Sequence, residues 1–140
     1  MSTARHLSVL PIADGHYEVT LEEALEMHEA LLGIGGGRPG VMRLEALLGA
    51  LGRPYHGYHE ALEEKAAALL HAVATCHAFA DGNKRTALGV TLLMIGRSGY
   101  RIELRKGERI DDVPVDLIEG RMTQDDLVAW FRERMVPRGM

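Results

Sequence analysis

Two long apolar segments, separated by only a few residues, constrain the fold of this chain more than any other feature. From about residue 60 to His77, leucine, alanine and valine recur at helical spacing behind N-terminal glutamates, and His77 continues the buried stripe. From Asn83 to about Ser98 a second segment is apolar nearly all round. Because the connection "FADGN" is so short, the two helices must turn back sharply and pack together. We expect the second to be the central helix of the core.

The residues before this pair predict a hairpin followed by a helix. Residues 7–19 contain an Asp14-Gly15 turn between two short extended stretches, which favours a small β-hairpin. Thr20 and Glu23 have the spacing of a capping box at the start of "LEEALEMHEALLG". Leu21, Leu25, His28, Leu31 and Leu32 recur at helical spacing along this helix.

A glycine-rich break and a second short helix come next. The stretch "GIGGGRPG" at 33–40 follows a helix rather than a strand and lacks the G-K-[ST] ending of a phosphate loop, so we interpret it as a plain loop. A short helix is expected over 44–52, where Gly52 and Pro54 end it. We interpret the following "RPYHGYH" as an exposed, aromatic-rich connection.

The C-terminal part predicts a strand and a last amphipathic helix. "YRIEL" at 100–104 has the pattern of a short strand, and the charged stretch that continues to residue 121 predicts no regular element. Thr123 starts a helix whose apolar positions run from Leu127 to Met135. The sum is an all-α, mainly helical domain covering 1–140, with a small N-terminal hairpin.

Composition excludes several classes of function. A net charge of −4 gives no field that would hold nucleic acid or an anionic membrane, so neither is an expected partner. Cys76 is the sole cysteine, which rules out an intramolecular disulfide and fits a reducing compartment. The N-terminal apolar run is too short for a signal peptide, and no window approaches a membrane span. We therefore expect a cytoplasmic protein.

The junction of the two helices carries an unusual set of charges. Lys84 and Arg85 occupy the first turn of the second helix, where the helix dipole disfavours cations by about 0.3–1 kcal/mol each. Together with the free amides after Gly82 and Asn83, they predict a phosphate site. Asp81 would then hold a magnesium ion that bridges phosphate oxygens. The misplaced charge of Arg85 also predicts that alanine in its place weakens ATP binding without lowering stability.

His77 is the remaining reactive group at the junction. An imidazole changes charge near neutral pH and, in the last turn of one helix facing the start of the next, could reach an oxygen that attacks a bound phosphate. Two simpler interpretations stay open. Asp81-Gly82-Asn83 could be an ordinary turn in which Asn83 caps the next helix, and His77 could be a hydrogen-bonded core histidine.

The motif "HAFADGNKR" resembles the signature of the Fic/Doc family, in which these residue types lie between two antiparallel helices. "GRPGVMRLEALLGALGRP", "EKAAALLHAVATCHAF" and "NKRTALGVTLLMIGRSGY" are similar to the corresponding stretches of its Doc (death on curing) branch. The resemblance covers about residues 38–136. It implies that ATP and Mg²⁺ are the cofactors.

The resemblance also implies roles for the motif residues. His77 would be the general base that takes the proton of a target hydroxyl, and Asp81 the magnesium ligand. Phe79 would be the buried anchor of the loop. The anion hole would consist of Asn83 and the main-chain amides of residues 82–85, and Arg85 would contact the nucleotide phosphates.

Two positions depart from the adenylyltransferases of the family. Lys84 stands where a glycine is usual, and Leu88 where a second arginine is usual. In Doc-like toxins this arrangement goes with ATP bound in inverted orientation and transfer of its γ-phosphate to a threonine of elongation factor Tu, which stops translation. Gly82 is the residue of the adenylyltransferases, where the Doc prototype has alanine, so AMP transfer stays an alternative. A second alternative is a non-catalytic binding module with the same fold.

The chain lacks the family's inhibitory helix signature, a Ser or Thr followed four residues later by Glu and then Gly or Asn. The resemblance therefore implies restraint by a separate, Phd-like antitoxin, whose disordered C-terminal segment folds over the site.

Overall fold

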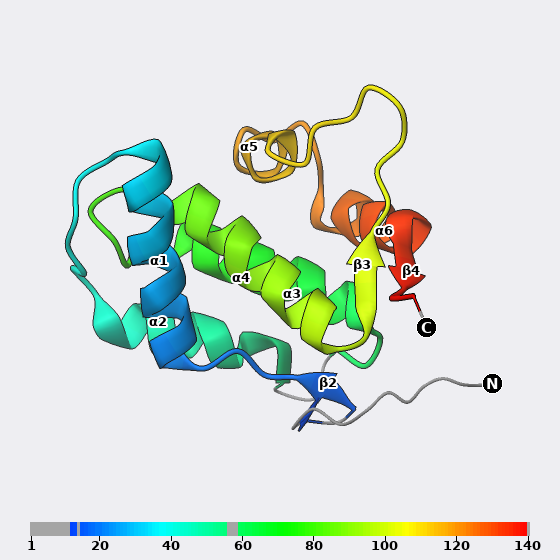
Figure 1. The fold of residues 1–140 in the computed structure, drawn as a ribbon, viewed down its shortest axis with the longest axis horizontal. Coiled ribbons are helices and arrows are strands. Elements are labelled where there is room, and N and C mark those ends of the chain that lie inside the picture. The colour runs from blue at the N-terminus through cyan, green and yellow to red at the C-terminus, as the bar shows by residue number, and fades with distance from the viewer. Residues whose placement is uncertain (1–11, 14, 56–58, 140) are drawn as a thin grey trace.

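Two antiparallel helices form the centre of the fold, as the sequence predicts. A computed structural model describes residues 12–13, 15–55 and 59–139. In it α3 (Leu62–Thr75) and α4 (Asn83–Arg97) lie side by side, with the other helices around them (Figure 1). The predicted end of the first helix is wrong, because α3 stops at Thr75 and Cys76 caps it. His77 therefore lies outside the helix and outside its buried stripe.

The N-terminal hairpin and helix are confirmed. Strands β1 (Ile12–Ala13) and β2 (His16–Tyr17) pair antiparallel, and Gly15 has the positive φ that this turn requires. The capping box of Thr20 and Glu23 starts α1 (Leu21–Gly35), which runs two residues further than predicted. This extension places the end of α1 inside the glycine-rich stretch.

A polar cluster ties the N-terminal end of α1 to the far end of α4. The Arg97 guanidinium donates to the Tyr17 hydroxyl over 2.7 Å and pairs with the Glu23 carboxylate. Tyr17 in turn donates to Glu23 over 2.7 Å. The hydrogen bonds to Glu23 outweigh the effect of its partial burial and lower its pKa. The cluster fixes the direction in which α1 crosses α4.

The segment after α2 is less exposed than its sequence predicts. Helix α2 (Leu44–Gly52) ends as expected, but a single 3₁₀ turn (Arg53–Tyr55) follows it. Pro54 is buried in this turn, and the half-buried Tyr55 hydroxyl donates to the main chain of Tyr17. The expectation of an exposed connection is wrong for these residues, because Tyr55 packs against the core. Of the rest of the predicted connection, His59 is partly buried, and residues 56–58 lie outside the described residues.

The C-terminal region contains two elements that sequence patterns did not predict. Strand β3 (Tyr100–Ile102) is confirmed, and β4 (Met135–Pro137) pairs with it antiparallel. Helix α6 (Gln124–Arg134) begins with a Thr123 capping box but ends one residue before the predicted Met135. Helix α5 (Asp112–Ile118) lies within the stretch that predicts no regular element.

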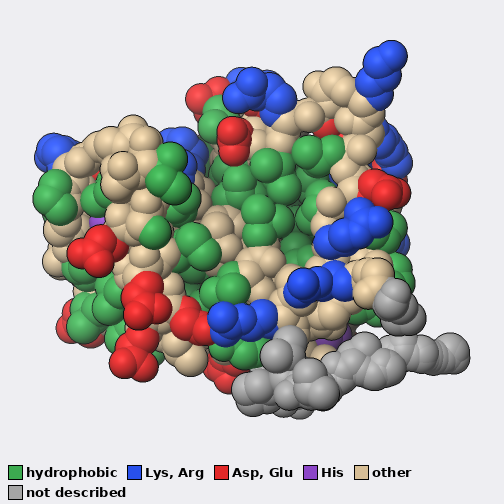
Figure 2. All heavy atoms as spheres, in the orientation of Figure 1, with side chains coloured by type: hydrophobic (Ala, Val, Ile, Leu, Met, Phe, Trp, Pro, Cys, Tyr) green, Lys and Arg blue, Asp and Glu red, His purple; other side chains and the backbone are tan. Residues whose placement is uncertain are grey.

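The fold is thus mainly α-helical, with two small antiparallel pairs. Acidic and apolar side chains lie on different parts of the face shown in Figure 2. Acidic side chains lie along α1, and apolar side chains gather over α4 in the middle of this face. No helix in the described part of the chain is long and apolar enough to cross a bilayer.

An ion pair between Glu108 and Arg134 ties the loop after β3 to α6. Arg134 donates through Nε to Glu108 over 2.9 Å, and its side chain is only 7% exposed. The Arg134 side chain and then the Arg105 amide lower the pKa of Glu108 to about 2. The stabilisation is therefore complete above the unfolded-state pKa of 4.5 and is lost as the pH falls toward 2.

We expect replacement of Glu108 by glutamine to flatten the acid dependence of stability. The melting temperature of the parent should fall more steeply than that of Glu108→Gln between about pH 5 and pH 3. Thermal unfolding followed by circular dichroism at a series of pH values measures both slopes. Equal slopes would show that the pair contributes nothing to the acid dependence.

Candidate active site

The turn between α3 and α4 runs beside the loop that follows α1. The Gly40 carbonyl accepts the Ala80 amide over 3.1 Å, and the Ala78 carbonyl accepts the Met42 amide over 2.7 Å. Between these bonds Val41 and Phe79 form an antiparallel bridge. The interpretation of residues 33–40 as a plain loop is wrong for residues 33–35, which belong to α1, and holds for residues 36–40. The end of this loop pairs with the motif through Gly40 and Val41.

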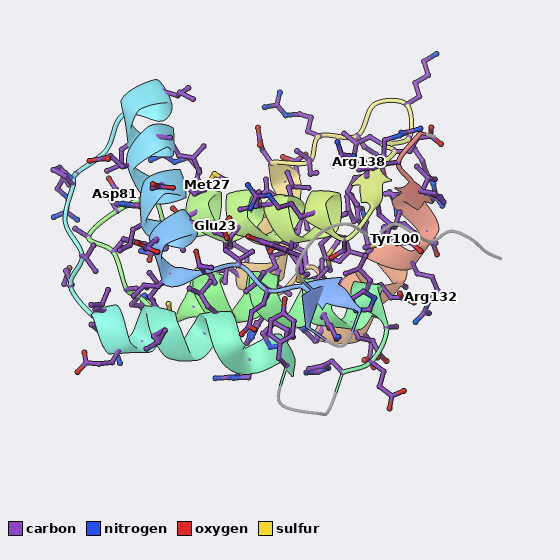
Figure 3. All side chains as sticks on the ribbon, turned by 60° about the horizontal axis from the view of Figure 1, so that its bottom comes forward. Glu23, Met27, Asp81, Tyr100, Arg132 and Arg138 are labelled. Atoms are coloured by element: carbon purple, nitrogen blue, oxygen red, sulfur yellow. The ribbon has the colours of Figure 1, made fainter. Side chains whose placement is uncertain are left out.

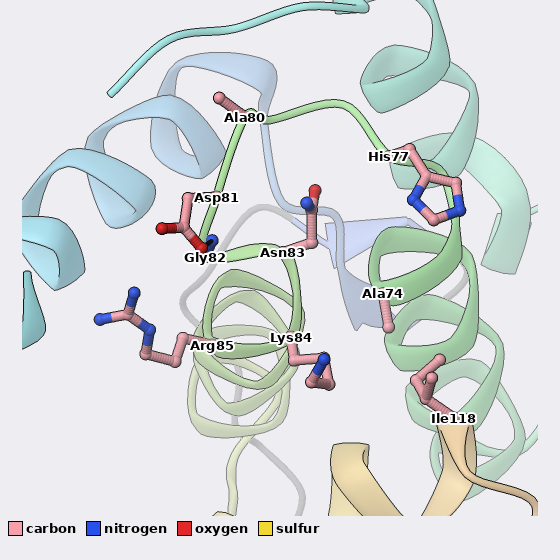
Figure 4. Close-up of a pocket in the computed structure, with 9 residues that line it drawn as sticks. All are labelled: Ala74, His77, Ala80, Asp81, Gly82, Asn83, Lys84, Arg85 and Ile118. Atoms are coloured by element: carbon pink, nitrogen blue, oxygen red, sulfur yellow. Dashed lines mark hydrogen bonds between the residues drawn. The ribbon is translucent and has the colours of Figure 1, made fainter. Parts of the chain in front are cut away.

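His77 has an unusual backbone conformation. It follows the Cys76 cap of α3 with a φ of 53°, and it is the one non-glycine residue with positive φ in the described segments. Such a conformation is strained for a residue with a Cβ. Its ring is exposed and faces the cavity rather than the core (Figure 4). The interpretation of His77 as a core histidine is therefore wrong.

Phe79 and Asn83 close the turn. Phe79 is 3% exposed and its ring stacks on that of His28, with centroids 3.7 Å apart. The Asn83 side chain accepts from the Phe79 amide over 3.1 Å and donates to the Phe79 carbonyl over 3.0 Å. Asn83 does not cap α4, because Gly82 is the N-cap, with a φ of 78° that favours glycine. The Asn83 side chain thus fixes the loop, while its own amide stays available.

The N-terminus of α4 opens into the cavity with unpaired donors. The amides of Asn83, Lys84 and Arg85 have no acceptor among the described residues, and no side chain caps this end. The Gly82 amide, in contrast, donates to the Asp81 carboxylate over 2.9 Å. Of the amides expected in the anion hole, those of residues 83–85 therefore remain free for an anion.

Lys84 and Arg85 point to opposite sides of the cavity. Lys84 is exposed, forms no ion pair within the described segments, and extends toward Ala74 and Ile118 (Figure 4). Arg85 turns toward α1 and donates to the Gly36 carbonyl over 2.8 Å and to the Leu31 carbonyl over 3.4 Å. Both cations still line the cavity.

The contacts of Arg85 correct the expectation that its charge is unfavourable in the unliganded protein. Although Arg85 lies at the positive end of α4, its guanidinium lies at the negative C-terminal end of α1, where a cation is favourable. We expect Arg85→Ala to lower the unfolding free energy by about 1–2 kcal/mol. Urea denaturation of the unliganded protein measures this loss, with Arg53→Ala, an exposed arginine whose side chain forms no hydrogen bond within the described segments, as the control. An unfolding free energy of Arg85→Ala equal to that of the parent would support the expectation from sequence that Arg85 does not stabilise the unliganded protein.

Asp81 is held as a carboxylate beside these cations. Its Oδ2 accepts the Arg38 amide over 3.1 Å, and its Oδ1 accepts the Gly82 amide. These two amides, then the charges of Arg38 and Arg85, lower the pKa of Asp81. In Figure 3 Asp81 lies against the same helix that carries Glu23 and Met27.

The surroundings of Asp81 fit a magnesium ion shared with a ligand. No cluster of three or more metal-binding side chains occurs in the described part of the chain. One ionised carboxylate with spare lone pairs, next to free amides and two cations, suits an ion that keeps its waters and binds phosphate oxygens. Asp81 would hold this ion.

One cavity of about 310 Å³ brings the predicted polar residues together. It is lined by His77, Asp81, Gly82, Asn83, Lys84 and Arg85, whereas Phe79 lies buried behind it. Sequence reasoning missed Ala74, Ala80 and Ile118, the last of which comes from the unpredicted α5. It also missed His28, which packs against the motif from α1.

Comparison with known proteins agrees with this site. The sequence model of the Fic/DOC family matches residues 18–95, which include α1 to α3, the motif and α4 up to Ile95. The chain belongs to the Fic/DOC family. It is also 36% identical over 89 residues to the protein kinase Doc of Escherichia phage P1, an alignment that spans 60% of this chain and 70% of that protein. Membership of the Fic/DOC family accounts for the helix pair with the motif at its junction.

Proposed function

We propose that this Fic/DOC protein is a toxin enzyme that transfers the γ-phosphate of ATP to a hydroxyl group of elongation factor Tu. The observation that carries the proposal is the shared cavity of His77 and the open N-terminus of α4. A histidine available to accept a proton thus faces donors available to hold phosphate. Positioning and charge neutralisation are the main requirements of phosphoryl transfer.

The residues have complementary parts in the reaction. His77 accepts the proton of the target hydroxyl as its oxygen bonds to the γ-phosphorus, and the bond from that phosphorus to the β,γ-bridging oxygen breaks. ADP leaves, and the target keeps the phosphoryl group. The amides of residues 83–85 and the Lys84 ammonium hold the phosphate oxygens, because they have no acceptor among the described residues. Asp81 would hold a magnesium ion, which would supply charge neutralisation of the phosphates.

Two features favour phosphoryl transfer over AMP transfer. Lys84 extends into the cavity, where it occupies space beside the phosphate site. Leu88 is 8% exposed and packs in the core, so this position offers no cation to the cavity. The name of the similar phage protein, a protein kinase, supports the same choice. AMP transfer would attack the α-phosphorus instead and release pyrophosphate.

Intact-mass spectrometry of the target tests the proposal. Purified protein is incubated with elongation factor Tu, ATP and Mg²⁺, alongside His77→Ala and the control His71→Ala, an exposed histidine of α3 outside the cavity. The parent and the control should add a phosphoryl group and release ADP, and His77→Ala should not. A mass increase of the target by one AMP group would show that the enzyme is an adenylyltransferase and not a kinase. Binding of the factor without a mass change would indicate a non-catalytic module.

Restraint of the enzyme is proposed to come from a Phd-like antitoxin in the same cytoplasm, which covers the site in trans. Expression without the antitoxin should arrest growth for the parent but not for His77→Ala at equal protein levels. Equal toxicity of the two would overturn a catalytic origin of the arrest. Restored growth when the antitoxin is co-expressed with the parent completes the test.

A further inference from the structure

His28 contacts the motif from the middle of α1 and touches neither the cavity nor its opening. Its side chain is buried, with the residue only 5% exposed. The ring Nε2 lies 2.8 Å from the Asp81 carbonyl oxygen, and the ring plane stacks on Phe79 at an interplanar angle of 9°. One side chain therefore holds two residues of the turn, at both ends of the Phe79-Ala80-Asp81 segment.

The partner of His28 determines which nitrogen carries the proton. A carbonyl oxygen only accepts, so Nε2 must donate to Asp81. Because the ring is buried, no water can readily take its place, and loss of the donor would leave a polar oxygen without a partner. This hydrogen bond is therefore stronger evidence for a role than the position of His28 on an apolar stripe.

Asp81 connects the carboxylate of the proposed phosphate site to the free amides at the start of α4. Its carboxylate accepts the amides of Arg38 and Gly82, and Gly82 is the N-cap from which α4 begins. A rotation of the peptide that follows Asp81 would turn the Gly82 amide away from Oδ1 and tilt the first turn of α4. His28 opposes this rotation, because it holds the carbonyl of that same peptide.

We propose that His28 is a positioning residue for the phosphate-transfer site. From the rigid α1 it fixes the peptide between Asp81 and Gly82, and so aims the Asp81 carboxylate and the free amides of α4 at a bound nucleotide. It acts through Asp81 and touches no reacting atom. The inference rests on the proposed function for its catalytic consequence, but the structural effect on the turn is independent of it.

A matched pair of substitutions separates the hydrogen bond from simple filling of the core. Glutamine and methionine have similar lengths, but only glutamine carries a donor at the ε position, where it can reach the Asp81 carbonyl. Both lose the stacked ring equally. The control Ile95→Val trims a buried side chain at the far end of α4 and should cost stability without touching the turn.

Hydrogen exchange of the unliganded protein, followed peptide by peptide, measures how well the amides of the turn between α3 and α4 are protected. In His28→Met the hydrogen-bonded amides of Phe79, Ala80 and Gly82 should exchange about tenfold faster than in His28→Gln, which should stay close to the parent. The Mg²⁺ concentration for half-maximal transfer should rise by a similar factor in His28→Met alone. Ile95→Val should change neither quantity.

The outcomes distinguish the inference from the proposed function. Equal exchange of the turn in His28→Gln and His28→Met would overturn the positioning role, whatever the enzyme does. If neither variant folds, His28→Phe, which keeps the ring and lacks the donor, must show the fast exchange of the turn or the role is refuted. If the parent transfers no phosphate but the exchange difference is present, the proposed reaction fails and the role of His28 in the turn stands.

Discussion

Replacement of His77 by glycine is expected to stabilise the folded protein while abolishing its activity. Glycine adopts the φ of 53° without strain, so His77→Gly should raise the unfolding free energy by about 0.5–1 kcal/mol. Loss of the proposed proton acceptor should lower the rate of transfer by about 10²- to 10⁴-fold. Urea denaturation and single-turnover transfer assays measure the two effects on the same samples.

Two controls separate the backbone effect from the loss of the imidazole. His77→Ala should lose the same activity without the gain in stability, because alanine keeps the Cβ that makes this φ unfavourable. His71→Gly changes an exposed helical histidine and should instead cost about 0.5 kcal/mol while leaving transfer intact. A His77→Gly variant less stable than the parent would mean that the left-handed conformation is not strained in solution.

Replacement of Asp81 by asparagine should lower activity nearly as much as replacement of His77. The amide removes the charge that would hold magnesium, and transfer should fall by at least about a hundredfold. It also disturbs the turn, because each carboxylate oxygen accepts one backbone amide, from Arg38 and from Gly82. Whichever way the asparagine amide is oriented, its NH₂ group faces one of these donors.

Calorimetric titration of ADP with and without Mg²⁺ measures whether Asp81→Asn has lost the proposed magnesium ligand. The parent should bind ADP more tightly when Mg²⁺ is present, and Asp81→Asn should lose this difference. Glu29→Gln, an equal change of charge on the exposed surface of α1, serves as the control and should keep it. A magnesium effect that survives in Asp81→Asn would exclude this carboxylate as the ligand.

Features of the fold that depend on local sequence were predictable. The capping box of Thr20 and the helix start at Thr123 appear where they were predicted, because each depends only on residues close in sequence. The helix pair follows from apolar periodicity and a short connection in the same way. Six of the nine residues that line the cavity were predicted, because the motif itself supplies them in one short stretch.

Features that depend on distant partners were not predictable. Strand β4 exists because Met135–Pro137 pairs with Tyr100–Ile102, more than thirty residues earlier. The contact of Arg85 with the Gly36 carbonyl and that of His28 with Asp81 join segments 49 and 53 residues apart. Periodicity grouped His28 with the leucines of its helix, but only the packing of α1 against the turn shows what it contacts.

The C-terminal ends of α1 and α3 and the N-terminal end of α4 lie close together around the cavity. Their side-chain partners make the local charge positive, whereas the whole protein is negative. Arginines cover the negative ends: Arg85 donates to α1, and Arg43 donates to the Cys76 carbonyl at the end of α3 over 3.1 Å. The positive end of α4 stays open. The chain carries a net charge of −4, so extended polyanions meet repulsion, whereas a small phosphate ester inside the cavity meets mainly positive charge. For the proposed nucleotide site, this arrangement would favour small phosphate esters over extended polyanions.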